Sequence, residues 1–546
     1  MLNTHRVRSR AIAAAAFAAG LALALSSCSS PSAPAGGTEQ HEAAPGFLAV
    51  ADDALTGSGA LTVQLDYDTS EADGLDPQTA QTARSWMIMG LVYETLVTTD
   101  EKFAIAPGLA TSWKRPDDTT YVFTIDTSAK FSNGRALSTA DVVGSLKRLA
   151  GGKSIWTGQL GPVSSITATG ANEVTVKLSA PYAPFLAALA NTPAAILPMQ
   201  EIEQGTLDPK TAMLGTGPYT VVSHRQDQSW KFAANPAWRG GEIPVRDLEL
   251  QIVAQESTRQ AGLREGSAGM ANFVNIDALT QLAGTAGVKV VNQTQSDFYY
   301  LYENSQRPGS PLQDQDVRFA INTAVDRKAI SDIVFAGTAS PTGITPSNLP
   351  GACAVGDLPS ERATVEEAKR AIDGAKLGGR KLSLLVYTSE PVLAQMAQLI
   401  QQQLAEVGVA VTIEQYDAAT YRAKIETAKP GDFDLALGWY AGYGDPSMVT
   451  KWWNPEQALF NTGFVGVHED LNRLIDQGAS TLDPKERAKV LTELCASADR
   501  YSEIVPLVHR PSIIGYSTKS VSPTIASNEG YGDILRNLTD YRVVGK

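Results

Sequence analysis

The hydrophobic pattern differs between two parts of the chain. From residue 94 to residue 213, short runs of alternating apolar and polar positions recur, such as TYVFTID at 120–126 and EVTVKLS at 173–179. Gly, Pro and an Asn-Gly pair separate these runs, which is typical of β-strands joined by turns. The sequence therefore predicts a largely β domain in this part.

Helical and strand periodicities alternate from residue 315 to residue 510. KLSLLVYT at 381–388 predicts a strand, and a strand at 409–416, a short helix at 421–428 and a strand at 434–439 come later. Between the first two strands, an amphipathic helix is predicted by Leu393, Met396, Ala397, Ile400, Leu404 and Val407. This β-α-β-α-β order predicts a parallel sheet covered by helices.

The last predicted strand runs into an aromatic stretch, WYAGYGDP at 439–446. Open parallel sheets bind ligands beyond the carboxyl ends of their strands, because the connecting loops diverge there. We therefore expect a ligand-binding site at this edge. Its candidate residues are Gly438, Trp439, Tyr440, Ala441, Gly442 and Tyr443. The alternative is that Trp439 and Tyr443 fill a hydrophobic core.

The N-terminus has the features of an export signal. A basic segment at 5–10 precedes an Ala/Leu-rich run at 11–25, and LSSC at 25–28 resembles the bacterial lipobox. We expect a signal peptide at 1–27, a lipid on Cys28 and a tether at 28–59, which together would anchor the protein to the outer face of the cytoplasmic membrane. An ordinary signal peptide with a chance cysteine is the alternative.

If Cys28 carries lipid, two cysteines remain, Cys353 and Cys495. In an exported protein, such a pair suggests one disulfide. Two buried free thiols are the alternative.

Length, charge and motifs limit the function. A chain of 546 residues normally divides into two to four domains. A net charge of −13 argues against nucleic acid and against an anionic membrane bound by charge alone. The five histidines form no HExxH pattern, and the chain contains neither SxxK nor GxSxG. We therefore expect no enzyme, cofactor or metal, and an exported hydrolase is the alternative.

Seven blocks of sequence, in order along the chain, resemble one known family. They are GLDPQ (74–78), LVYETLVTTD (91–100), APGLATSWKRPDDTTYVFTI (106–125), AKFSNGRALSTADVVGSLKRL (129–149), GTGPY (215–219), DVRFAINTAVDRKAI (316–330) and VPLVHRP (505–511). The family is that of the extracytoplasmic solute-binding proteins of ABC importers, in the class serving dipeptides, oligopeptides and nickel.

The resemblance implies an α/β fold of the periplasmic-binding-protein type, namely two-lobed type II with an extra β-rich domain inserted in the N-terminal lobe. Lobe I would comprise residues 60–93, 214–290 and 510–546, the inserted domain 94–213 and lobe II 291–509. The ligand would bind between the lobes of a monomer, and the closed form would then dock on the membrane permease.

The resemblance also implies a mode of peptide binding. Peptide binders of the family lay the ligand backbone along the strand that ends here at Gly438 and Trp439. The family aspartate that neutralises a free amino group falls on Gly442, and residues 431–450 contain no arginine. We therefore expect either a peptide whose end is placed differently or a non-peptide such as a sugar, an opine or a metal chelate. A sensor domain on the same fold is a further alternative.

Overall fold

A computed structural model describes residues 47–151, 156–347, 349, 351–375, 377, 379–458, 460–526, 528–529 and 534–544. The predicted signal peptide, Cys28 and the tether up to residue 46 lie outside the described residues. The described residues belong to one compact unit of the chain.

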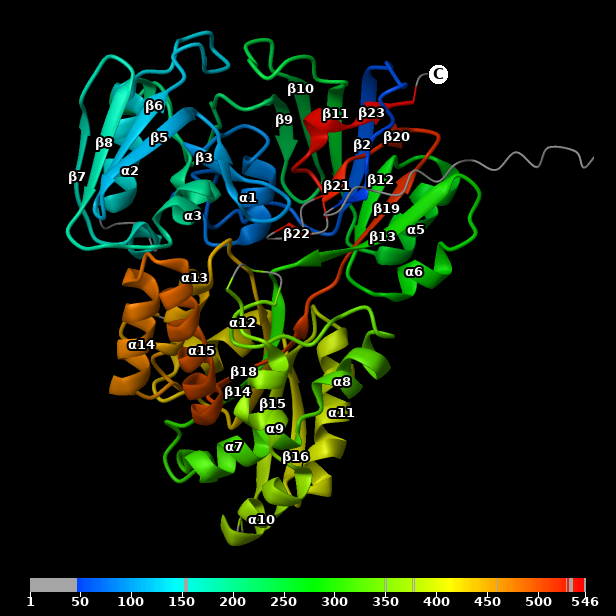
Figure 1. Ribbon diagram of the computed structural model, residues 1–546. Coiled ribbons are helices and arrows are strands. Elements are labelled where there is room, and N and C mark those ends of the chain that lie inside the picture. The colour runs from blue at the N-terminus through cyan, green and yellow to red at the C-terminus, as the bar shows by residue number, and fades with distance from the viewer. Residues whose placement is uncertain are drawn as a thin grey trace, which may run out of the picture. The chain divides into compact units, whose positions relative to one another are not determined.

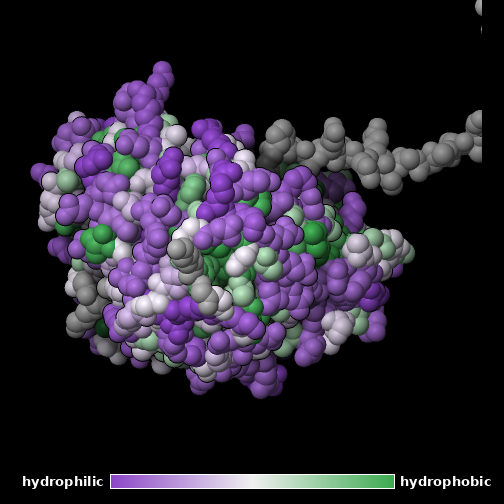
Figure 2. Space-filling model, turned by 90° about the horizontal axis from the view of Figure 1, so that it is seen from below, coloured by the Kyte–Doolittle hydropathy of each residue, from purple (hydrophilic) through white to green (hydrophobic). Residues whose placement is uncertain are grey.

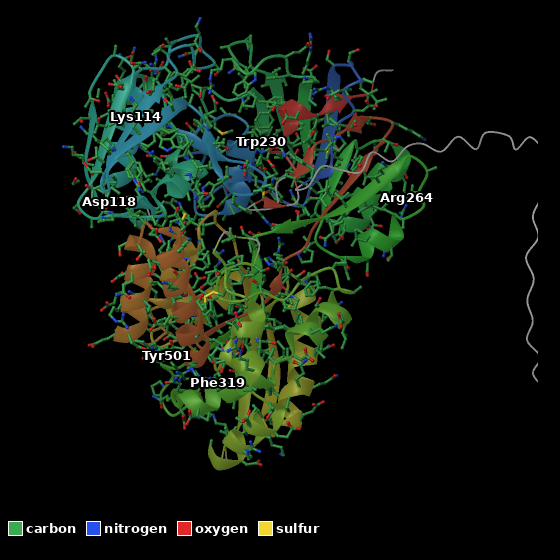
Figure 3. The ribbon with its side chains drawn as sticks, viewed as in Figure 1. Lys114, Asp118, Trp230, Arg264, Phe319 and Tyr501 are labelled. Atoms are coloured by element: carbon green, nitrogen blue, oxygen red, sulfur yellow. A yellow bond between two sulfur atoms is a disulfide. The ribbon has the colours of Figure 1, made fainter. Side chains whose placement is uncertain are left out.

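An eight-stranded mixed sheet is built from separated stretches of sequence (Figure 1). Its order is β22 (Asn528–Glu529), β13 (Val288–Gln295), β19 (Ser512–Ser517), β12 (Met270–Phe273), β2 (Gly59–Leu65), β11 (Val245–Ile252), β10 (Ser229–Ala234), β9 (Tyr219–Arg225). The associated helices are α1 (Ala83–Met89), α5 (Glu256–Glu265) and α6 (Asp277–Gln281). Strand β2 runs parallel to both β11 and β12. Trp230 on β10 is fully buried in the core of this part (Figure 3).

The strands predicted at 120–126 and 173–179 form as β6 and β8 in a separate antiparallel sheet. Its order is β5 (Ala110–Asp117), β6 (Thr120–Ile125), β8 (Glu173–Leu178), β7 (Val163–Ala168). Nearby elements are β3 (Val97–Thr99), β4 (Ile105–Pro107), α2 (Thr139–Ala150), α3 (Phe185–Ala190) and α4 (Met199–Glu203). Helix α2 starts at a capping box, in which Ser138 and Asp141 satisfy each other's backbone N–H groups.

The predicted β-α-β-α-β segment forms part of a five-stranded sheet. Its order is β16 (Ala410–Tyr416), β15 (Lys381–Tyr387), β17 (Leu435–Tyr440), β14 (Phe298–Glu303), β18 (Ile504–His509). Strand β15 runs parallel to β16 and β17, as predicted, and α11 (Val392–Glu406) buries the predicted apolar stripe. The sheet also contains two strands that the prediction did not cover. Strand β14 lies antiparallel to both β17 and β18, so the sheet is mixed.

Further helices accompany this sheet. They are α7 (Gln315–Ala324), α8 (Arg327–Ala329), α9 (Pro359–Arg362), α10 (Val365–Ala375), α12 (Ala418–Arg422), α13 (Pro446–Thr450), α14 (Glu469–Ser480) and α15 (Pro484–Tyr501). The helix predicted at 421–428 begins earlier, at Ala418, because the Asp417 side chain caps it by accepting from the Thr420 N–H at 2.9 Å.

Short turns and strands link the elements above. The 3-10 and π turns are η1 (Thr157–Leu160), η2 (Thr192–Ala194), η3 (Pro311–Gln313), η4 (Ile330–Val334), η5 (Val355–Asp357), η6 (Ala423–Thr427), η7 (Lys451–Trp453) and η8 (Leu538–Asp540). The remaining strands are β1 (Phe47–Ala49), β20 (Val521–Ser522), β21 (Ile525–Ala526) and β23 (Arg542–Val543).

Two very short segments connect the large sheets. Ser296 and Asp297 lie between β13 and β14, and Arg510 and Pro511 lie between β18 and β19. The Arg510 N–H donates to the Asp297 carbonyl oxygen at 2.9 Å, so the two connections are bonded to each other. Below, these four residues are called the crossing segments.

Cys353 and Cys495 are joined by a disulfide, with their Cα atoms 6.3 Å apart. Cys495 lies on α15, and Cys353 lies in the segment between η4 and η5. The bond therefore ties a long connection of the chain to a helix that packs on the five-stranded sheet.

The surface is polar where it can be followed in a space-filling view. On the face in Figure 2, hydrophilic residues predominate and apolar residues are scattered among them, as on ordinary protein surfaces. Among the described residues, no helix combines the length and the apolar character needed to cross a bilayer.

Candidate functional site

The candidate segment starts within a strand. Gly438, Trp439 and Tyr440 are the last residues of β17, and the loop begins only at Ala441. The strand predicted at 434–439 therefore ends one residue later, and Trp439 lies within it rather than on the loop. The strand is longer because β14 pairs with it through Tyr440, where Phe298 is the partner.

Strand alternation sends the first two aromatic residues to opposite faces. Tyr440 is buried among Tyr300, Tyr302 and Trp452, and its hydroxyl donates to Asn461 Oδ1 at 3.1 Å. Burial raises the pKa of Tyr440 well above its usual value. The structure thus places Tyr440 in the core of the sheet's other face rather than on the pockets described below.

Trp439 is half-buried and lines a pocket of about 30 Å³ that residues of both large sheets surround. We call it the charged pocket, because two carboxylates and two guanidinium groups reach it. They belong to Asp66, Arg84, Asp297 and Arg510. Asp66 directly follows β2, Arg84 lies in α1, and the other two are in the crossing segments.

Arg510 is held firmly above Trp439. Its guanidinium carbon lies 4.4 Å from the centroid of the Trp439 ring, which is a cation–π distance. Its Nε donates to Glu390 Oε1 at 3.0 Å, and the Tyr299 hydroxyl donates to the same oxygen at 2.9 Å. Burial alone would disfavour the charge, but the Glu390 carboxylate keeps the pKa of Arg510 above its usual value. Arg510 is therefore a fixed positive charge over one face of the Trp439 ring.

The carboxylates of the pocket are also positioned. Asp66 Oδ1 accepts from Asn272 Nδ2 at 2.6 Å, and Asp66 Oδ2 lies 3.5 Å from Arg84 Nη2. Burial tends to raise the pKa of Asp66, but Arg84 and the Asn272 hydrogen bond hold it below its usual value. Asp297 Oδ1 accepts from the Gly442 N–H at 2.7 Å. The pocket therefore presents both signs of charge.

Gly442 is packed against a crossing segment. A Cβ atom at this position would lie 2.0 Å from Ser296 Oγ and 2.3 Å from the Ser296 carbonyl carbon. The backbone therefore leaves no room for a side chain at residue 442. Gly438 is similarly close to another residue, since a Cβ atom there would lie 2.4 Å from Tyr300 Oη.

A larger cavity of about 660 Å³ extends along α1. Met87 of α1 lines both this cavity and the charged pocket. Tyr443, which is 4% exposed, lines the larger cavity beside Gly444. On another wall, Arg239 Nη1 lies 2.7 Å from Glu94 Oε2, and burial raises the pKa of Glu94.

Trp439, a candidate residue of the sequence, lines the charged pocket, but the pattern does not predict the charged residues around it. Asp66, Arg84, Asp297 and Arg510 are scattered over more than 400 positions and share no motif. One signal was available, because Asp66 directly follows the apolar run LTVQL at 61–65 and the ends of such strands form ligand crevices. Among the described residues, no three His, Cys, Asp or Glu side chains gather as a metal-binding group.

Two lobes of α/β structure, with a charged pocket where the chain crosses between them, define the class of two-lobed binding proteins. Residues 104–460, more than half of the chain, match the family model of the bacterial extracellular solute-binding proteins, family 5. The chain belongs to this family, which confirms the family and the type II fold that the sequence blocks predicted.

The chain is also similar to individual proteins in sequence and in fold. The probable D,D-dipeptide-binding periplasmic protein of Escherichia coli (strain K12) is 26% identical over 438 residues, or 76% of this chain and 82% of the relative. A periplasmic binding protein from Helicobacter pylori, solved with the peptide STSA, has a TM-score of 0.75 and 20% identity over 89% of this chain and 98% of that one. A binding protein from A. tumefaciens R10, solved with agropinic acid, has a TM-score of 0.75 and 23% identity over 89% and 99%.

Proposed function

We propose that this chain is the solute receptor of an ABC importer, which captures a small amphoteric, peptide-like solute between its lobes and delivers it to the membrane permease. Family membership supports the receptor role. Relatives named for a D,D-dipeptide and a bound tetrapeptide support a peptide-like ligand.

The charged pocket is the observation that carries this proposal. Trp439 offers a flat apolar surface, and Asp66, Arg84, Asp297 and Arg510 surround it with two charges of each sign. A solute that reaches this pocket is favoured if it complements charges of both signs, because hydrogen bonds to charged groups are the stronger ones. A solute with both an ammonium and a carboxylate fulfils this condition, whereas a neutral sugar does not.

Gly442 favours a second candidate within the same class. The crossing segment fills the space that a side chain at residue 442 would need. A carboxylate from that position is therefore excluded. A free amino group of the ligand would have to be bound by other residues than in the family's peptide-binding pattern. An amphoteric non-peptide such as an opine satisfies the pocket equally well, and one structural relative was solved with agropinic acid.

Export and anchoring complete the proposed role. The lipobox-like LSSC at 25–28 supports a lipid on Cys28, which would keep the receptor on the outer face of the cytoplasmic membrane near its permease. Family relatives are solute-binding proteins, so a non-enzymatic role is proposed in preference to a hydrolase or a sensor.

The test is to identify what the purified protein carries. Solutes released by denaturing the natively purified wild type are identified by mass spectrometry, and the Trp439→Ala variant is compared with Trp113→Ala on β5 as the control. Truncating a buried aromatic anchor costs about 2 kcal/mol or more, so Trp439→Ala should weaken binding roughly thirtyfold. The proposal fails if both variants retain the wild-type solute with equal affinity in calorimetry.

A further inference from the structure

The guanidinium groups around the charged pocket differ in how they are held. Arg259, near Asp66, donates from Nε to the Asn272 carbonyl at 2.8 Å and from Nη1 to the Val253 carbonyl at 2.6 Å. Arg510 is bonded to Glu390 and stacked on Trp439. Moving either group would leave buried polar partners unsatisfied, which is costly.

Arg84 is held much less tightly. Its side chain is 33% exposed, and its ion pair with Asp66 is long, at 3.5 Å. Its guanidinium carbon also lies 5.3 Å from the centroid of the Tyr67 ring. Asp66 keeps its place without Arg84, because the Asn272 amide donates to its other oxygen at 2.6 Å. Arg84 can therefore turn toward a ligand while Asp66 keeps its hydrogen bond to Asn272.

We propose that Arg84 binds the carboxylate of the transported solute and so determines its specificity for acids. This inference rests on the proposed receptor function. Arg84 lines the charged pocket from α1, whereas Trp439 lines it from β17. The carboxylate would therefore bind on the side of the eight-stranded sheet. The planar fork of arginine matches a carboxylate with two parallel hydrogen bonds.

The size of the effect follows from the bond type. Hydrogen bonds to charged groups are worth more than neutral ones, and losing one changes affinity by about tenfold to a hundredfold. Arg84→Gln should lower the affinity for solutes with a carboxylate by this factor and leave the affinity for solutes without one unchanged. Arg84→Lys keeps the charge but loses the fork, so it should retain an intermediate preference.

The experiment uses two probes and three variants of the full-length protein. One probe is an equimolar mixture of di- and tripeptides with free C-termini, and the other is the same mixture with C-terminal amides. Peptides retained after desalting are quantified by mass spectrometry for the wild type, Arg84→Gln and Arg84→Lys. The control is Arg264→Gln on α5, an exposed arginine outside both pockets (Figure 3). Melting temperatures verify that each variant is folded.

The expected result is that the wild type and Arg264→Gln prefer acids over amides by tenfold or more and that Arg84→Gln loses this preference. An undiminished preference in folded Arg84→Gln overturns the assignment of Arg84. Equal retention of acids and amides by the wild type overturns it as well. Retention of neither mixture by the wild type has a different meaning, because it refutes the peptide-like ligand of the proposed function itself.

Discussion

Replacing Gly442 by alanine tests the packing of the crossing segment directly. The added Cβ atom would lie 2.0 Å from Ser296 Oγ and 2.3 Å from the Ser296 carbonyl carbon. Carbon atoms pack comfortably at about 3.5 Å, so the 2.3 Å contact alone requires the loop and the crossing segment to separate by roughly 1.2 Å. Because one neighbour is backbone, rotation of a side chain cannot relieve the contact.

Two costs contribute to the expected loss of stability. Overpacking of this kind costs about 1–3 kcal/mol. The same separation breaks the 2.7 Å hydrogen bond from the Gly442 N–H to Asp297, and bonds to charged groups contribute about 1.5–3 kcal/mol. We expect Gly442→Ala to lose about 3 kcal/mol or more.

Gly444→Ala is the matched control, two residues along the same loop. Its Cβ atom would meet Phe103 Cδ1 at 3.6 Å and Thr99 Cγ2 at 3.7 Å, which are ordinary contacts. This change should alter stability by less than about 0.5 kcal/mol. Urea denaturation followed by tryptophan fluorescence compares the two variants with the wild type. Equal midpoints for Gly442→Ala and Gly444→Ala would refute the argument from steric exclusion.

Three further predictions concern other parts of the chain. Glu303 is fully buried, and neither carboxylate oxygen finds a hydrogen-bond partner among the described residues. Burial raises the pKa of Glu303 well above its usual value, so its stabilising contribution is complete below the unfolded pKa of about 4.3 and is lost as pH rises through the folded pKa. Glu303→Gln should therefore gain stability over the wild type as pH increases in urea titrations, and an unchanged difference from pH 4 to pH 8 would contradict this. Reducing the Cys353–Cys495 bond, which spans 142 residues, should lower the free energy of unfolding by about 2–5 kcal/mol, and two free thiols in unreduced denatured protein would contradict the bond. Cys28→Ser should release the protein from the membrane fraction or leave the precursor uncleaved, and normal processing with full membrane retention would exclude lipidation.

The sequence was informative where local pattern decides the structure. The stripe from Leu393 to Leu404 and the strands around it appear as predicted, because amphipathic periodicity is a local property. The antiparallel direction of β14 and β18 was not predictable in this way, because it depends on how the chain crosses between the sheets.

The charged residues of the pocket could not be predicted from the sequence for a related reason. Asp297 lies beside Gly442 only because of the tertiary fold, since 144 residues lie between them in the sequence. Trp439 and Tyr440 face opposite sides of the sheet because side chains alternate along a strand. This could be inferred only once β17 was known to extend through Tyr440. The hydrophobic pattern therefore predicts the strand on which Trp439 lies, whereas the charges around that residue come together only in the folded structure.

The crossing segments have a consequence for redesigning the receptor. Any rotation of one lobe against the other must be absorbed by the few residues that link them, and Asp297 and Arg510 are among these. Two of the four charged residues that line the charged pocket therefore also belong to the links between the lobes. We expect substitutions at Asp66 or Arg84 to retarget the receptor while its closing rate, measured by stopped-flow fluorescence, stays constant. Substitutions at Asp297 or Arg510 should change selectivity and closing rate together, so the two properties cannot be evolved independently there.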